Sequence, residues 1–196
     1  MDAILLLLNV VAMAADDTAV YRIQPADDAS TALTVEKTGL LSGKKHLFTF
    51  RRYVGTLQFN RQWLERSSVQ LSISSASIEC QDTWINERDR KKVTDVALND
   101  MLGASQYPEI VFRSTRIQGT GGGPLQVDGE LTIRGRTKPV VVKVSVNMGQ
   151  NDRVIVKGET RIRLTHYGLK PPSAAFGAVG TKEEMLFIFT VIARPE

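Results

Sequence analysis

Hydrophobic and polar residues alternate most clearly between positions 129 and 146. Leu131 and Ile133 fall on one face of a first extended segment, and four valines fall on one face of a second segment: Val140, Val142, Val144 and Val146. Lys143 points the opposite way, and Gly135 marks a tight turn between the segments. A period of two predicts a β-hairpin with one dry face and one wet face. The dry face needs a cover, from a curled sheet or a partner sheet.

The same alternation recurs along most of the chain. It predicts strands over residues 19–23, 31–38, 47–59, 68–78, 109–118, 125–134, 137–148, 153–164 and 184–193. Within 47–59 the apolar face changes near Gly55, which predicts a bulge or bend there. The last segment is apolar on both faces. This predicts a strand that is covered on both sides, with the helical segment as a candidate cover.

One helical segment interrupts the strands. Val93, Val96, Ala97 and Met101 recur at helical spacing, and charged residues at 88–92 cover the other side, which predicts a helix within 83–102. Gly103 suits the position after a helix C-terminus. The chain is therefore predicted to be mainly β, a single antiparallel barrel of about eight strands with one helical insertion. A closed barrel removes exposed sheet edges.

An eight-stranded barrel is just wide enough to be filled by side chains or to hold one small ligand. Alternation alone does not distinguish a packed interior from an occupied one. If the interior binds a ligand, the candidate binding residues are the apolar residues that alternation places inside: Leu71, Ile73, Phe112, Leu131, Ile133, Val142, Val144, Phe187 and Phe189. A one-residue error in register would invert the assignment for a strand.

Composition and charge narrow the classes of partner that the chain is expected to bind. The chain has 196 residues, enough for one domain with a sizeable core, and its 42% hydrophobic and 23% charged residues are ordinary for a globular protein. The net charge of +4 is mild, and the basic residues are spread along the chain. A nucleic-acid surface needs clustered basic residues with stacking aromatics. We therefore predict no nucleic-acid partner.

Candidate catalytic groups are few. The two histidines, His46 and His166, are far apart in the sequence and lack the close His–His spacing of many metal sites. No Gly-x-Ser-x-Gly motif is present, and the glycines at 119–123 fit a hairpin loop. Each histidine is interpreted as a strand-end or loop residue bonded to the backbone. Cys80, the single cysteine, is interpreted as a small buried hydrophobe. We predict no enzyme activity, no catalytic residue and no metal ligand.

The first residues resemble an export signal. An apolar run at 4–8 is followed by the small-x-small pattern Ala12-Met13-Ala14 and by two aspartates. A basic residue before the apolar run is missing, which leaves a truncated or an atypically short signal as alternatives. The predicted organisation is a signal peptide over 1–14 and one barrel domain over 15–196, with cleavage after Ala14.

Two motifs are the most specific of this chain, residues 107–114 (YPEIVFRS) and 129–140 (GELTIRGRTKPV), and shorter ones lie at 21–23, 35–39, 86–89 and 164–169. Together, and in this order and spacing, they resemble the YceI-like family of polyisoprenoid-binding proteins. In the family, Arg-Asp is often followed by a His-Leu pair, whereas here Arg90, Lys91 and Lys92 follow. Any contact of that histidine with a ligand head is therefore not carried over.

The resemblance implies a lipocalin-like barrel, periplasmic or secreted, that holds the tail of an isoprenoid quinone or similar amphiphile. It carries over no catalytic residue and implies no covalent cofactor, only a bound isoprenoid lipid. The expected function is non-catalytic binding, transport or sequestration of that lipid, with transient membrane contact as a further possibility and the oligomeric state left open. The alternative is a packed structural or stress-related periplasmic barrel that binds partners on its surface, and an enzyme ranks third.

Overall fold

A computed structural model describes residues 17–120 and 122–196. The predicted signal segment, residues 1–14, lies outside the described residues. The strands are β1 (Thr18–Ile23), β2 (Ser30–Gly39), β3 (Lys45–Phe50), β4 (Tyr53–Asn60), β5 (Ser68–Ser74), β6 (Ile78–Cys80), β7 (Glu109–Gln118), β8 (Leu125–Ile133), β9 (Arg136–Met148), β10 (Val154–Arg163), β11 (Ser173–Ala174) and β12 (Val179–Pro195). The helical segment is α1 (Glu87–Asp95), continued by a π-helical stretch, η3 (Val96–Leu102).

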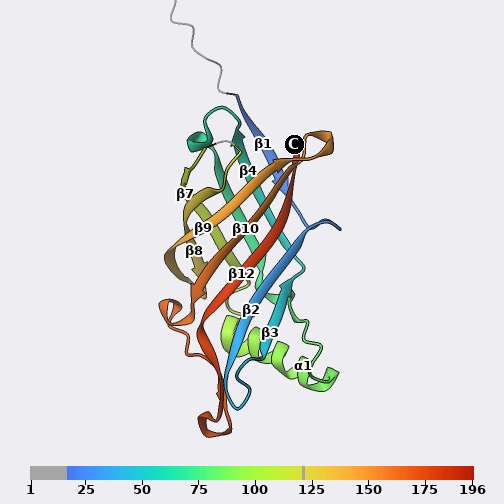
Figure 1. The fold of residues 1–196 in the computed structure, drawn as a ribbon, viewed down its shortest axis with the longest axis vertical. Coiled ribbons are helices and arrows are strands. Elements are labelled where there is room, and N and C mark those ends of the chain that lie inside the picture. Colours follow the sequence, from blue (N-terminus) through green and yellow to red (C-terminus); the bar gives the residue numbers. More distant parts are fainter. Residues whose placement is uncertain (1–16, 121) are drawn as a thin grey trace, which may run out of the picture.

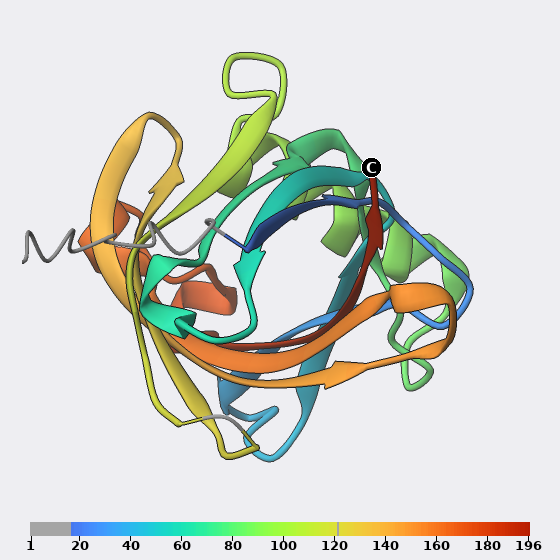
Figure 2. The ribbon, with the colours of Figure 1, turned by 90° about the horizontal axis from the view of Figure 1, so that it is seen from above.

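Eight strands close into a barrel, as predicted. Their order is β1-β4-β5-β7-β8-β9-β10-β12, and β12 pairs back with β1, where Ile23 lies opposite Ala193. All of these pairings are antiparallel, so sequence neighbours such as β7, β8, β9 and β10 follow one another as hairpins. Figure 2 looks into the ring that these strands form. The ring leaves none of its eight strands with an unpaired edge.

A side sheet extends from the barrel. The 17-residue strand β12 pairs not only with β10 and β1 but also with β2, which carries β3 and then β6. The β2–β3 turn, the β11–β12 hairpin and α1 all lie at one end of the molecule, at the bottom of Figure 1. The chain termini of the described part lie near the opposite end.

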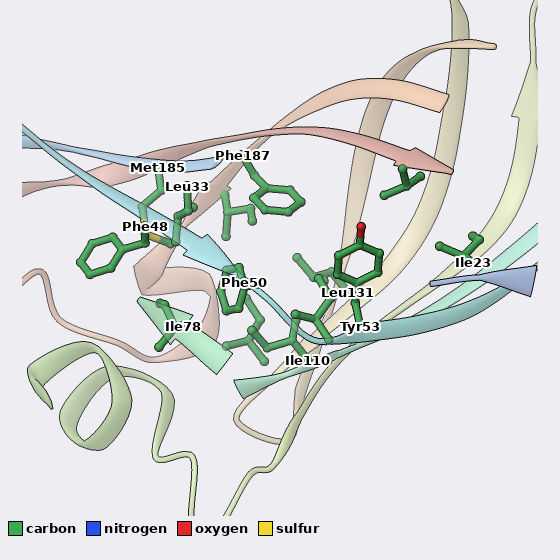
Figure 3. Packing of buried hydrophobic residues seen from close by; sticks show 14 of the residues in the cluster. Ile23, Leu33, Phe48, Phe50, Tyr53, Ile78, Ile110, Leu131, Met185 and Phe187 are labelled. Atoms are coloured by element: carbon green, nitrogen blue, oxygen red, sulfur yellow. The ribbon is translucent and has the colours of Figure 1, made fainter. Parts of the chain in front are cut away.

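The predicted strand over 47–59 is two strands, and the predicted bend near Gly55 is wrong. The break falls at Arg51 and Arg52, both exposed, between β3 and β4. Phe50 and Tyr53 are both buried, so the inward positions change from even to odd numbers across the break (Figure 3). Two extra residues between them allow both aromatic rings to face the core. Gly55 lies within regular β4 pairing, opposite Leu71.

The helix begins later than the start of the predicted window. Asn86 caps it, because its side-chain Oδ1 accepts a hydrogen bond from the Asp89 backbone N–H at 2.9 Å. The helical segment ends at Leu102, and Gly103 follows it as predicted, in the left-handed conformation. Within the described residues, no helix is long and apolar enough to cross a membrane.

The last strand is not covered on both sides. Phe187 and Met185 face the core, as the alternation predicts (Figure 3). On the other face Ile188 is 46% exposed, whereas Ile192 is buried. The helix cannot be the general cover that the sequence suggested, because it lies at the lower end of the barrel (Figure 1).

Candidate functional site

The barrel encloses a cavity of about 470 Å³. Its wall is built almost entirely from aliphatic and aromatic side chains that every barrel strand contributes. The predicted interior residues all line it: Leu71, Ile73, Phe112, Leu131, Ile133, Val142, Val144, Phe187 and Phe189. Six of these nine are buried, and Leu71, Phe112 and Phe189 are partly buried. Their contact with a ligand stays a prediction.

Aromatic rings and glycines shape the wall together. Phe187 packs edge-on against Phe50, with ring centroids 6.3 Å apart, and tilts against Phe189 at 5.7 Å. A Cβ at Gly129 would lie 2.5 Å from the Phe112 ring, and one at Gly158 would lie 2.5 Å from the Phe189 ring. Glycine in these strands therefore leaves room for a neighbouring ring.

The cavity opens at the lower end of the barrel. Most lining residues are buried or partly buried, but four are exposed: Lys92, Val96, Ser173 and Ala174. Lys92 and Val96 belong to the helical segment, and Ser173 and Ala174 form β11. Both elements lie at the bottom of Figure 1. We call this end of the cavity the mouth.

Polar side chains enter the wall near the mouth. Along β2, Leu33 and Val35 face the cavity, and the next inward residue is Lys37. Val35 pairs with His46 of β3, so Lys37 and His46 are diagonal neighbours on the same face. Thr181 of β12 lies opposite Lys37 and also lines the cavity. The cavity thus changes from an apolar body to a polar end within two strand positions.

A buried carboxylate orients His46. The Nδ1 atom of His46 lies 2.5 Å from Asp82 Oδ2, and the other oxygen of Asp82 accepts a hydrogen bond from the Leu47 backbone N–H at 2.8 Å. The Trp84 ring stacks on the imidazole at a centroid distance of 5.5 Å. With Nδ1 committed to Asp82, the Nε2 atom is the ring nitrogen left for a ligand.

Burial acts on two further groups beside this pair. It lowers the pKa of Lys37 below its ordinary value, although the charge of Asp82 acts in the opposite direction. Burial also raises the pKa of the Cys80 thiol to about 11. The Cys80 thiol therefore stays protonated at neutral pH. This fits the interpretation of Cys80 as a small buried hydrophobe, since it packs in the core cluster.

His46, Cys80 and Asp82 place one donor atom each within 4.8 Å of one another. Nitrogen, sulfur and oxygen donors of this kind suit zinc. In this structure, however, Asp82 is already bonded to His46 and to the Leu47 N–H. The geometry is that of a hydrogen-bonded pair with a neighbouring thiol.

Tyr167 is a further polar residue in the cavity lining. It lines the cavity and is 3% exposed, and its hydroxyl has no hydrogen-bond partner among the described residues. Burial raises the pKa of Tyr167 to about 12, so the hydroxyl is neutral and can donate. A buried hydroxyl without a partner is costly and calls for an explanation, such as a polar group on a bound molecule.

Sequence reasoning missed this polar end. His46 was interpreted as bonded to the backbone, but its partner is a carboxylate 36 residues later in the chain. His166 lies exposed in the 3-10 turn η5 (Leu164–Tyr167). One signal was available, because Lys37 and His46 break the apolar alternation on the inward faces of β2 and β3.

Curated proteins match part of this chain in sequence. A UPF0312 protein of Pseudomonas savastanoi is 31% identical over 129 residues, covering 63% of this chain and 64% of that protein. One of Vibrio cholerae is 28% identical over 131 residues, covering 64% and 66%. The chain therefore spans slightly less than two thirds of the length of these curated relatives.

Solved structures share the fold at low identity. BcnA of Burkholderia cenocepacia superposes with a TM-score of 0.65 at 22% identity, over 83% of this chain and 95% of that one. A polyisoprenoid-binding domain from Saccharophagus degradans, implicated in plant cell wall breakdown, gives 0.65 at 12% identity, over 89% and 98%. The YceI-like domain family matches residues 21–191. The chain belongs to the YceI-like family.

Proposed function

We propose that this protein binds and carries or sequesters an isoprenoid-chain lipid, quinone-like or another prenyl amphiphile, with the tail inside the barrel. The observation that supports this most is the cavity inside the barrel. Its body is apolar, and its mouth carries polar side chains. Such a cavity matches an amphiphile, with an apolar body for the tail and a polar end for the head. The polyisoprenoid-binding domain that shares the fold points to the same ligand class.

Tail burial supplies the main driving force. Burying one CH₂-sized group stabilises a complex by roughly 0.8 kcal/mol, so one five-carbon unit contributes about 3–4 kcal/mol as an upper bound. A few units would approach the practical limit of non-covalent affinity, about −18 to −21 kcal/mol, before ordering costs are subtracted. Affinity is therefore expected to follow tail length until the cavity is full.

The head group is proposed to lie beside Lys37 and His46. A head with hydrogen-bond-accepting oxygens could receive a bond from the Lys37 ammonium, and His46 Nε2 could exchange a further bond with it. Asp82 would hold the imidazole in one orientation. This arrangement lets the head tune affinity while the tail dominates it.

Binding without catalysis is the proposed mode of action. Nucleophilic catalysis needs an activated nucleophile beside a base. The thiol nearest to His46 is that of Cys80, and burial keeps its pKa at about 11. The packed structural barrel is the weaker alternative, because a cavity of about 470 Å³ is larger than a packed core leaves.

Native mass spectrometry of gently purified protein tests the proposal. We expect an added mass that organic extraction removes and that fragments as a prenyl lipid. Protein that carries no lipid and takes up none when mixed with prenyl quinones would favour the packed barrel with surface partners.

Calorimetry across two ligand series sharpens the test. Shortening the tail by one isoprene unit should weaken binding steeply, whereas changing the head should have a smaller effect. His46→Ala should reduce the dependence on the head, and exposed His166→Ala is the matched control. Dominance of the head over the tail would contradict the tail-site proposal.

Export is a separate part of the proposal. The pattern Ala12-Met13-Ala14 supports cleavage after Ala14 and a periplasmic or secreted location. N-terminal sequencing of protein from the native host should begin at Ala15 or within a few residues of it. Intact Met1 in a cytoplasmic fraction would contradict the export proposal and leave the lipid-binding proposal unaffected.

A further inference from the structure

Two loops lie side by side at the mouth. One is the β2–β3 turn, residues 39–44, and the other is the β11–β12 turn, residues 174–178, which contains the 3-10 turn η6 (Ala175–Gly177). The Leu40 backbone N–H donates a hydrogen bond to the Ala178 carbonyl at 3.0 Å, and Gly39 pairs with Val179. We call these two loops the tip. In Figure 1 they form the lowest point of the molecule.

The tip exposes large apolar side chains. Leu40 is 82% exposed, and Phe176 is fully exposed, at 112% of the reference value. Ala175 and Phe176 both have positive φ angles, 51° and 55°, a conformation that costs energy for residues other than glycine. This strained turn holds the phenyl ring in water, so folding does not explain its presence.

The two chain segments that contain the tip carry charge of one sign. Residues 37–46 contain three lysines and no carboxylate, and residues 169–182 contain two lysines and no carboxylate. Glu36, just outside, pairs with Lys45 at 3.3 Å and with Lys182 at 2.5 Å. In the described part of the chain, neither Lys44 nor Lys170 forms an ion pair. The tip therefore presents apolar groups together with the unpaired Lys44, and the unpaired Lys170 lies in the segment that leads to β11.

We propose that the tip docks on an anionic phospholipid bilayer, with Leu40 and Phe176 inserted at the headgroup level. Apolar side chains flanked by lysines are what a negatively charged membrane surface attracts. Docking in this orientation brings the cavity mouth, with Ser173 and Ala174, to the membrane. The inference goes beyond lipid binding in the cavity, because Leu40 and Phe176 do not line it.

Vesicle co-sedimentation tests the docking. The full chain is mixed with vesicles of phosphatidylcholine alone and of phosphatidylcholine with phosphatidylglycerol. We expect binding to the anionic vesicles that weakens with salt. The double variant Leu40→Ser, Phe176→Ser should weaken partitioning by about tenfold or more, since two exposed apolar groups no longer insert. Lys44→Glu with Lys170→Glu should remove the preference for phosphatidylglycerol.

Trp63→Ser is the matched control. Trp63 is 50% exposed and lies beyond β4 at the opposite end of the barrel. Far-ultraviolet circular dichroism checks that every variant is folded. Unchanged partitioning of the Leu40, Phe176 double variant, or a loss caused by Trp63→Ser, would overturn the proposal.

Two other occupants of the tip are distinguishable. If the tip instead joins two copies of the chain, the double variant abolishes a concentration-dependent dimer in analytical ultracentrifugation and vesicle binding is absent. If the protein holds a prenyl lipid but ignores both vesicles, docking is wrong and lipid binding stands. If the protein docks on anionic vesicles but holds no prenyl lipid, docking stands and lipid binding in the cavity is wrong.

Discussion

The β8–β9 wall and the mouth differ in which side chains are buried and which are exposed. In the wall, Leu131, Val142 and Val144 are buried, and Lys143 between them is exposed, so each position is explained by the side of the sheet that it faces. At the mouth the pattern is reversed. His46 is buried and Phe176 is fully exposed. Folding accounts for the wall without reference to a ligand, whereas the mouth carries residues that cost stability and so call for a function.

The difference separates two kinds of inference. The wall sets what can enter the cavity, because nearly all of its atoms are apolar. The mouth determines how a head group or a membrane contacts the protein. There, polar groups are buried and apolar groups are exposed, the opposite of what folding favours. Substitutions in the two regions should therefore act on different observables.

The wall should show the largest effect. Val144→Asp places a carboxylate among apolar groups and should lower the free energy of unfolding by about 3 kcal/mol or more, or raise the pKa of the new carboxyl. Urea unfolding measures this. Lys143→Asp, one position away on the wet face, should leave stability and lipid binding almost unchanged. If Lys143→Asp were the damaging change, the assignment of faces in β9 would be inverted.

The Asp82 carboxylate should show the next effect. Asp82→Ala removes the acceptor for both the Leu47 N–H and His46, and should cost about 1–3 kcal/mol in urea unfolding. Asp82→Asn keeps an acceptor for the Leu47 N–H and should recover part of the loss. An Asp82→Ala variant as stable as the parent would mean that the pair at the mouth contributes nothing to folding.

The contribution of the buried Cys80 thiol to stability can be measured at alkaline pH. The folded-state pKa of Cys80 is raised from 9.0 to about 11, so its contribution to stability is complete below pH 9 and is lost as pH rises through about 11. Cys80→Ala removes this dependence. The difference in unfolding free energy between parent and variant should therefore shrink from pH 9 to pH 11, and a constant difference would show that burial does not perturb the thiol.

Replacing Tyr167 should have the smallest effect on stability. The direction of that change indicates whether its hydroxyl has a partner in the folded protein. Tyr167→Phe removes a buried hydroxyl that has no partner, so the lipid-free protein should keep its stability or gain up to about 1 kcal/mol. If a bound lipid accepts that hydroxyl's hydrogen bond, the same variant should bind the lipid more weakly in calorimetry. Weaker folding with unchanged binding would instead assign the hydroxyl a structural partner.

Much of the cavity could be predicted from the sequence. Alternation placed residues such as Leu131, Val144 and Phe187 on the inward face, because side chains on a strand repeat every two residues. The same local rule failed at Gly55, since the change of face occurs at Arg51 and Arg52. It failed again in β12, where the exposure of Ile188 depends on what lies above the sheet.

The sequence by itself determined most of the strands, though not the breaks within 47–59 and 68–78, as well as the helix with its Gly103 end, the closed antiparallel barrel and the dry interior. These follow from local periodicity, turn residues and the need to remove sheet edges. Only the tertiary structure decided that His46 meets Asp82 and that Leu40 and Phe176 share one tip. Each of these depends on strand register and on contacts between residues distant in the chain, which no local pattern records.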